Sequence, residues 1–176
     1  MKHLPLLLAL ISCLLFLGCE ERPGPDRTGA LPDQVVEEFR LHESHSGTKL
    51  YTLEAERALV FENEQRSDVV SPRVFFYDDA GRVAAVLVAD SGTIYSRTQD
   101  LVAKGHVQVA TAESTVLLTE SLAYNNQRRI VRTDAPVQVR TPEGSVSGQG
   151  LVSDAGLTRL EILSEVRGTS TYRFQP

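Results

Sequence analysis

A strand-pair pattern that recurs four times between Leu53 and Val166 constrains the fold of this chain more than any other feature. Each copy opens on an aliphatic residue with a small residue two positions later: Leu53 and Ala55, Leu87 and Ala89, Leu117 and Thr119, Val146 and Gly148. A segment centred on a valine follows each opening at a nearly constant spacing, at Val74, Val107, Val137 and Val166. Such a repeat indicates one domain built from four copies of a strand pair.

Apolar and polar residues alternate within the second segments, as in Val107-Gln108-Val109. This period of two is typical of a strand with one buried and one wet face. Turn-forming sequences separate the segments, at residues 78–81, 96–100, 125–126, 141–144 and 154–156. Residues 35–41 could form a short helix, but their β-branched and aromatic content favours a first strand, with a turn at 42–47. We therefore predict an all-β fold of about a dozen short antiparallel strands, as a rolled sheet, a jelly roll or a sandwich.

The amino-terminal segment, residues 1–33, predicts export and anchoring. Lys2 precedes an apolar stretch at residues 4–17, and Gly18 and Cys19 follow it, which is the layout of a signal peptide. The apolar stretch is shorter than the roughly 20 residues that a helix needs to span a bilayer. Residues 16–19 resemble a lipobox, so we expect residues 1–18 to be removed and Cys19 to carry acyl chains such as palmitate. Cys13 also fits the pattern, but cleavage there would leave apolar residues in water. The alternative is a plain signal peptide or short membrane anchor with an incidental cysteine.

Composition separates a tether from a folded domain and excludes several functions. Residues 19–33 are rich in proline, glycine and charge and predict a flexible tether, followed by the folded domain at 34–170. The chain is 41% hydrophobic with a net charge of −5 and has no dense basic run, which argues against nucleic acid as a partner. After Cys19 there is no further cysteine for a disulfide or a metal site. His42 and His45 lack a third ligand at a known spacing, so we expect neither a metal nor a cofactor.

The order and spacing of the motifs over residues 31–168 resemble the LptC family, the periplasmic bridge subunit of the lipopolysaccharide exporter. The motifs are Leu53-x-Ala55, Ser71-Pro-x-Val74-x-Phe76-Tyr77, Gly81, Leu87-x-Ala89-x-x-Gly92-x-x-Tyr95, Leu101-x-x-x-Gly105-x-Val107-x-Val109 and Thr133-x-x-Pro136-Val137-x-Val139. LptA and the periplasmic part of LptD share this style of repeat. LptC proteins are commonly held by a transmembrane helix, and this chain departs from that pattern if Cys19 is acylated.

The resemblance implies a twisted, open β-jelly roll whose apolar trough holds the acyl chains of lipid A. It implies the LptB–LptF–LptG transporter as the partner on one side, an LptA-like bridge protein on the other, and no ATPase activity in this chain, since the transporter supplies the energy. We expect that the chain is not an enzyme. The apolar residues that would line the trough, or fill a dry core instead, are Leu53, Val74, Phe76, Leu87, Val107, Val109, Leu117, Val137 and Val139. Strand ends would stack on the partners by β-augmentation, at edges carrying Val36, Phe39, Leu41, Leu160, Ile162 and Val166.

The resemblance implies a location in the periplasm, and the family role favours the inner membrane over the outer membrane for the expected lipid anchor. Glu20, which follows Cys19 in place of an aspartate, argues weakly for the outer membrane. Two other classes of function stay open. One is a structural lipoprotein of the cell envelope that stacks on partners without carrying lipid. The other is a hydrolase of envelope polymers, against which the sequence shows no constellation of acid, base and nucleophile.

Overall fold

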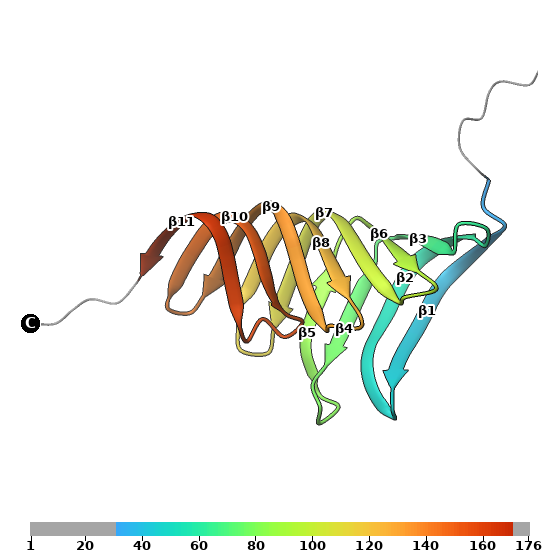
Figure 1. Ribbon diagram of the computed structural model, residues 1–176, viewed down its shortest axis with the longest axis horizontal. Coiled ribbons are helices and arrows are strands. Elements are labelled where there is room, and N and C mark those ends of the chain that lie inside the picture. Colours follow the sequence, from blue (N-terminus) through green and yellow to red (C-terminus); the bar gives the residue numbers. More distant parts are fainter. Residues whose placement is uncertain (1–30, 171–176) are drawn as a thin grey trace, which may run out of the picture. The chain divides into compact units, whose positions relative to one another are not determined.

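The computed structural model describes residues 31–170, and every regular element within this range is a β-strand. Eleven antiparallel strands form one twisted sheet (Figure 1), which confirms the predicted all-β fold and is consistent with a β-jelly roll. The predicted signal peptide, Cys19 and most of the predicted tether lie outside the described residues. The strands are β1 (Gln34–His45), β2 (Thr48–Phe61), β3 (Arg66–Val70), β4 (Arg73–Tyr77), β5 (Val83–Val88), β6 (Ser91–Tyr95), β7 (Asp100–Thr111), β8 (Val116–Asn125), β9 (Ile130–Thr141), β10 (Gly144–Asp154) and β11 (Leu160–Ser170).

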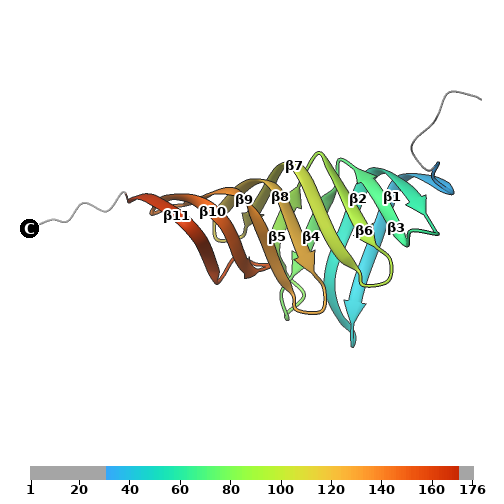
Figure 2. The same cartoon turned by 45° about the horizontal axis from the view of Figure 1, so that its top comes forward.

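The strands follow one another across the sheet in chain order (Figure 1, Figure 2). β3 and β4 pair with different halves of β2, and β6 and β5 continue these pairings to different halves of β7. β3 and β4 are thus one strand interrupted at Ser71 and Pro72, and β5 and β6 are one strand interrupted at Ala89 and Asp90. Proline donates no ladder hydrogen bond, so a break at Pro72 is expected. The eleven strands therefore trace nine passes of a simple meander.

A line of backbone irregularities crosses the middle of the sheet, and we call it the crease. Ser71, Gly105 and His106 have positive φ angles of 52°, 76° and 43° on it, as do Glu38, Gly150 and Glu165 in other passes. The pairings of β7 with β8, β8 with β9, β9 with β10 and β10 with β11 all shift register there. Glycine is favoured at residue 105, because φ there is positive and a Cβ would lie 3.0 Å from the Cβ of Asp90. Such bulges bend a sheet sharply, so the meander folds over on itself.

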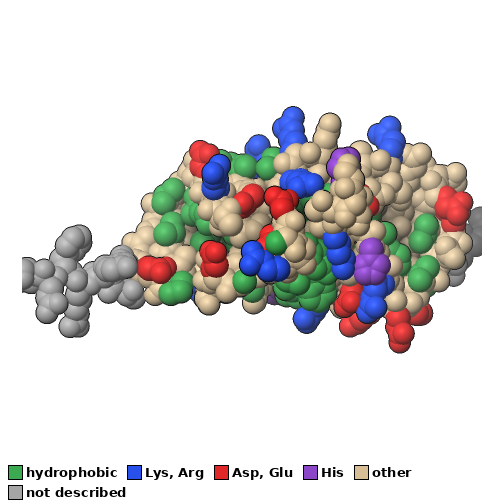
Figure 3. Space-filling model, turned by 90° about the horizontal axis from the view of Figure 1, so that it is seen from below, with side chains coloured by type: hydrophobic (Ala, Val, Ile, Leu, Met, Phe, Trp, Pro, Cys, Tyr) green, Lys and Arg blue, Asp and Glu red, His purple; other side chains and the backbone are tan. Residues whose placement is uncertain are grey.

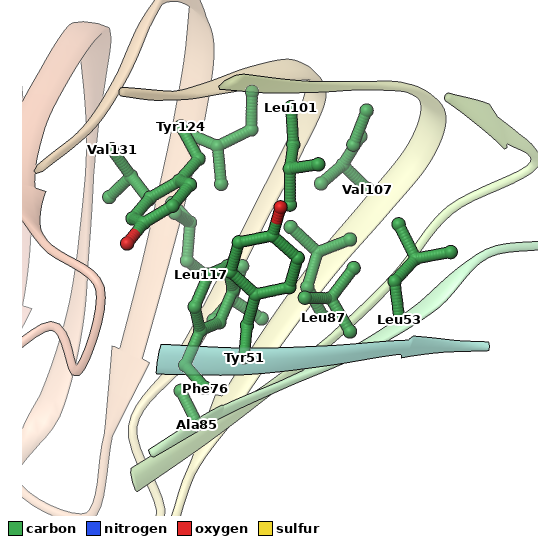
Figure 4. Packing of buried hydrophobic residues seen from close by; sticks show 14 of the residues in the cluster. Tyr51, Leu53, Phe76, Ala85, Leu87, Leu101, Val107, Leu117, Tyr124 and Val131 are labelled. Atoms are coloured by element: carbon green, nitrogen blue, oxygen red, sulfur yellow. The ribbon is translucent and has the colours of Figure 1, made fainter. Parts of the chain in front are cut away.

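The crease divides the sheet into two walls whose inner faces pack against each other. The first wall holds β4, β5 and the strand segments paired with them, within residues 39–55, 73–88, 107–119, 137–148 and 167–170. The second wall holds β3, β6 and their paired segments, within residues 34–37, 57–70, 91–104, 122–133 and 151–163. One continuous cluster of buried side chains from both walls fills the space between them (Figure 4).

The repeat positions lie on successive passes. The aliphatic first positions lie on β2, β5, β8 and β10, and the valine positions lie on β4, β7, β9 and β11. The division into four copies stays a prediction, since β3 and β6 interrupt two of them. The expected first strand at residues 35–41 is present as part of β1. The expected turn at 42–47 is wrong in its extent, because β1 continues through His45 and only Ser46 and Gly47 turn, both with positive φ.

Candidate functional site

The predicted trough residues all lie on the inner face of the first wall. Each of the nine is at most 5% exposed, and Leu117, Val107, Leu53 and Val109 are nearly or completely buried. The sheet brings them together by direct pairing, because Leu53 lies opposite Val74, Val74 opposite Leu87, and Leu87 opposite Val109. Cross-strand neighbours of this kind pack side by side on one face. The first wall therefore carries an unbroken row of apolar side chains across β2, β4, β5 and β7. Leu117 on β8 and Val139 on β9 extend this row.

Sequence reasoning missed the second wall, which faces these residues across the trough (Figure 4). Its inward side chains are also buried, and they include Val69, Ile94, Leu101, Ala103, Leu122, Tyr124, Val131 and Leu151. The signal that could have found them is the period of two in the other half of each long strand, such as Leu101 with Ala103 and Leu122 with Tyr124.

Three aromatic rings join the two walls. Tyr51 and Phe76 come from the first wall and Tyr124 from the second, with ring centroids 5.8 Å apart for Tyr51 and Tyr124 and 5.1 Å apart for Phe76 and Tyr124. The Tyr51 hydroxyl donates a hydrogen bond to the carbonyl oxygen of Gln99, 3.2 Å away in the turn between β6 and β7. Burial raises the pKa of both the Tyr51 and Tyr124 hydroxyls. Both tyrosines therefore stay neutral at physiological pH and act as packing and hydrogen-bonding groups.

A small apolar cavity lies between the walls. Its volume is about 20 Å³, and it is lined from the first wall by Leu53, Val74, Phe76 and Leu87. The second wall and Pro72 at the crease supply the remaining lining, which includes Val69, Gly92, Leu101, Ala103, Leu122 and Tyr124. A volume near that of one water-sized probe holds no acyl chain. The interior is consequently filled by the protein's own side chains, and only four of the nine predicted trough residues border the remaining space.

The buried polar groups near the trough have partners within the chain. The Thr119 hydroxyl donates to the carbonyl oxygen of Pro136 at 2.9 Å, and the Ser153 hydroxyl donates to that of Arg159 at 2.9 Å. Buried hydroxyl groups that are hydrogen-bonded in this way are neutral and need no further partner. The cavity lining is mostly apolar, and its polar side chains are the hydroxyl-bearing Thr93 and Tyr124.

The remaining titratable groups sit outside the trough. His42 lies on β1 and its Nδ1 is 3.0 Å from the Thr52 hydroxyl. Residues 31–170 hold no group of three or more potential metal ligands, and no helix that could cross a membrane. His106 pairs with Asp90, and this hydrogen bond and the carboxylate charge raise the His106 pKa. Figure 3 shows a group of hydrophobic side chains near the middle of one face of the protein, with cationic and anionic side chains around it.

The predicted partner edges correspond to the two terminal strands of the described sheet. β1 pairs with β2 and β11 pairs with β10, which leaves the other edge of each without a neighbour among the described residues. Val36, Phe39, Leu41 and Ile162 are half-buried and pack against the core. Leu160, Leu163 and Val166 on β11 are 37%, 44% and 59% exposed. β11 therefore combines an open backbone edge with exposed apolar side chains.

One comparison with known proteins identifies a relationship over nearly the whole chain. A family model described as "Lipopolysaccharide-assembly, LptC-related" matches residues 4–172. The match includes all eleven strands and both walls of the trough. A search of curated proteins finds no match.

Proposed function

Because this chain belongs to the LptC-related family of lipopolysaccharide-assembly proteins, we propose that it receives lipopolysaccharide from an inner-membrane ABC transporter and passes it to the next bridge protein. The family comprises periplasmic bridge proteins of lipopolysaccharide transport and is not a family of enzymes. The observation that carries the proposal is the apolar interior between two sheet walls, bordered by Leu53, Phe76, Leu122 and Tyr124. Acyl chains leave water for such an interior at about 25 cal/mol per Å² of apolar surface.

In this proposal the nine first-wall residues and the inward residues of the second wall line the lipid path together. The first wall supplies Leu53, Val74, Phe76, Leu87, Val107, Val109, Leu117, Val137 and Val139. Lipid A is the part of lipopolysaccharide whose acyl chains enter the trough, while the sugars stay in water.

Photo-crosslinking in cells tests this path. A photoreactive phenylalanine analogue fits at Phe76 and at Tyr124, because both positions are already aromatic and border the cavity. Tyr95, 42% exposed at the end of β6, is the matched outward position. We expect adducts with lipopolysaccharide at Phe76 and Tyr124 and none at Tyr95. Adducts absent from both inward positions in a folded, exported protein would refute the lipid path.

The terminal strands carry the proposed handover. β1, with Val36, Phe39 and Leu41, would face the LptB–LptF–LptG transporter, and β11, with Leu160, Ile162 and Val166, would face an LptA-like protein. A partner strand added to either open edge would satisfy its free backbone groups. Leu163→Pro removes a backbone donor from β11, whereas Leu163→Ala keeps it. We expect only the proline variant to lose the LptA-like partner in a pull-down.

We also propose that acyl chains on Cys19 anchor the protein to a membrane. Cleavage after residue 18 would leave an acylated Cys19 at the start of a tether that reaches the folded domain at residue 34, with the inner membrane favoured by the transporter's location. Several acyl chains hold a protein stably where one does not. Labelling with radioactive palmitate tests this: Cys19→Ser should abolish incorporation, and Cys13→Ser should leave it unchanged.

One observation favours a second candidate function, a structural lipoprotein that stacks on envelope partners without carrying lipid. The cavity of about 20 Å³ is too small for an acyl chain, as expected of a dry core. The crosslinking experiment separates the two candidates, since a dry core yields no lipopolysaccharide adducts while leaving pull-downs through β1 and β11 intact.

A further inference from the structure

Contacts between the two walls close the side of the trough that lies opposite the crease, which we call the mouth. The turns of the second wall meet the first wall along it. The Tyr51 hydroxyl on β2 reaches the Gln99 carbonyl in the turn between β6 and β7. Farther along, the Arg129 guanidinium in the turn between β8 and β9 lies 3.5 Å from the Asp79 carboxylate in the turn between β4 and β5. Both contacts join residues that lie at the ends of opposite walls.

The loop between β10 and β11, residues 155–159, also crosses the mouth, and it does so with several residues. It leaves the second wall at Asp154 and runs beside the end of β5 in the first wall (Figure 1, Figure 2). Leu157 is 6% exposed and belongs to the buried cluster between the walls. A Cβ built on Gly156 would lie 3.7 Å from the Cβ of Ala84 on β5. The loop thus spans the mouth and places one leucine inside.

The loop is attached to its own strand and only packed against the opposite wall. Within residues 31–170, its hydrogen bonds run to Asp154 and Ser153. The Thr158 amide donates to Oδ1 of Asp154 at 2.7 Å, the Thr158 hydroxyl also contacts this carboxylate, and the Leu157 amide donates to the Asp154 carbonyl at 3.1 Å. Across the mouth the loop contributes packing, through Leu157 and Gly156. Swinging it outward would break packing contacts and leave the strand ladders whole.

The backbone conformation of Leu157 also indicates that packing alone holds the loop against the opposite wall. Its φ is 55°, in the left-handed region that a leucine rarely adopts. Such strain persists only where the surroundings hold it, and here the burial of the leucine side chain does so. An apolar ligand that takes the place of the side chain would therefore also release the strain.

We infer that the structure is the closed state of the trough, and that the loop of residues 155–159 is a lid. Leu157 occupies a position that an acyl chain takes, and lipid enters sideways through the mouth when the lid swings out. This inference rests on the proposed function and adds the route of uptake. It also explains how a lipid carrier can have a cavity of only about 20 Å³ between its walls.

A disulfide across the mouth tests the lid. The separation of 3.7 Å between the Cβ positions of residues 84 and 156 suits a disulfide, and Gly156 has no positive φ that would oppose a side chain. Full-length Ala84→Cys/Gly156→Cys protein, purified in detergent, is titrated with fluorescently labelled lipopolysaccharide before and after reduction. We expect at least tenfold weaker binding in the oxidised form and recovery on reduction. The single variants Ala84→Cys and Gly156→Cys control for bonds to Cys13 or Cys19.

The outcomes separate the two proposals. Equal binding by oxidised and reduced double variant would overturn the lid and leave the proposed function standing. No binding by the reduced variant and by the wild-type protein would refute the proposed function, and the lid with it.

A second variant keeps the lid testable if the disulfide does not form. Leu157→Gly removes the inserted side chain and relieves the positive φ. We expect it to bind labelled lipopolysaccharide several-fold faster than the wild-type protein. The matched control is Gln65→Gly, which relieves a positive φ at an exposed residue in the turn between β2 and β3 and leaves the lid unchanged. Unchanged or slower association in a Leu157→Gly protein with a wild-type circular dichroism spectrum would overturn the lid.

Discussion

The two walls of the trough present different side chains to the same interior. The first wall contributes five of the six largest fully buried side chains, Tyr51, Leu53, Leu117, Val107 and Val109, although it also buries the smaller Ala55, Ala85 and Thr119. The second wall contributes one, Leu151. Between its leucines and valines it places small or hydroxyl-bearing residues, namely Ser67, Gly92, Ala103, Thr133 and Ser153.

The two walls therefore have different roles: the first fills the interior with large side chains, and the second leaves space beside its smaller ones. Gly92 and Ala103 border the cavity, whereas the bulk of the first wall lies away from it. The lid and the Gln99 and Arg129 contacts also originate from turns of the second wall. The first wall therefore supplies the rigid apolar surface, and the second wall supplies the room and the closing elements.

The largest effect is expected from a charge in the first wall. Val107 is 1% exposed, so Val107→Asp would bury an unpaired carboxylate and cost more than about 4 kcal/mol. The variant should fail to fold, as measured by circular dichroism and urea unfolding. Gln108→Asp, the exposed neighbour on β7, is the control. Wild-type stability in Val107→Asp would mean that the first wall does not face a packed interior.

A smaller loss of stability should follow when a large buried side chain of the first wall is replaced by a small one. Leu117 is completely buried on β8, and Leu117→Ala should lower the free energy of unfolding by about 3–5 kcal/mol, because it leaves a cavity. Leu163→Ala, 44% exposed on β11, should change it by less than about 0.5 kcal/mol. Urea titrations of both variants measure the difference, and similar values for the two would contradict the packing described here.

Filling the space beside the second wall should affect binding as well as stability. Ala103→Val adds two methyl groups next to the cavity and should cost about 1–3 kcal/mol of stability. We expect it to weaken binding of labelled lipopolysaccharide about fivefold, equivalent to about 1 kcal/mol. The control is Ala123→Val, which points outward on β8. Equal affinity in the two variants would remove the second wall from the lipid path.

The smallest effect concerns pH at the lid. Burial disfavours the charged form of Asp154, but hydrogen bonds from Thr158, Arg159 and Ser153 outweigh it and lower the pKa below the ordinary value of 3.8. A depressed pKa stabilises the folded loop above pH 3.8, and this contribution is lost as the pH falls through the lowered value. Asp154→Asn imitates the protonated state at neutral pH. Hydrogen exchange of the Leu157–Arg159 amides should be faster in this variant, and unchanged exchange would show that Asp154 does not hold the lid.

The sequence predicted one wall well and the other hardly at all, and β8 shows why. Its buried positions are Leu117 and Thr119 before the crease but Leu122 and Tyr124 after it. The bulge shifts the alternation by one residue, so a period of two counted from Leu117 places Leu122 and Tyr124 outside. The same shift occurs on β10, between Gly148 and Leu151. At Gly148 the strands approach closely, since a Cβ there would lie 2.7 Å from the carbonyl oxygen of Ser164 on β11.

The sequence by itself determined the all-β class, most of the turns, the nine inward residues of the first wall and the family, because alternation, turn chemistry and motif spacing are local properties of the chain. The tertiary structure decided where the sheet bends, which side chains of the second wall face the first, and that Leu157 closes the mouth. These features depend on contacts between residues far apart in the chain, such as Tyr51 with Gln99 and Gly156 with Ala84. No periodicity within a single strand specifies such contacts, since they arise only when the crease brings the two walls together.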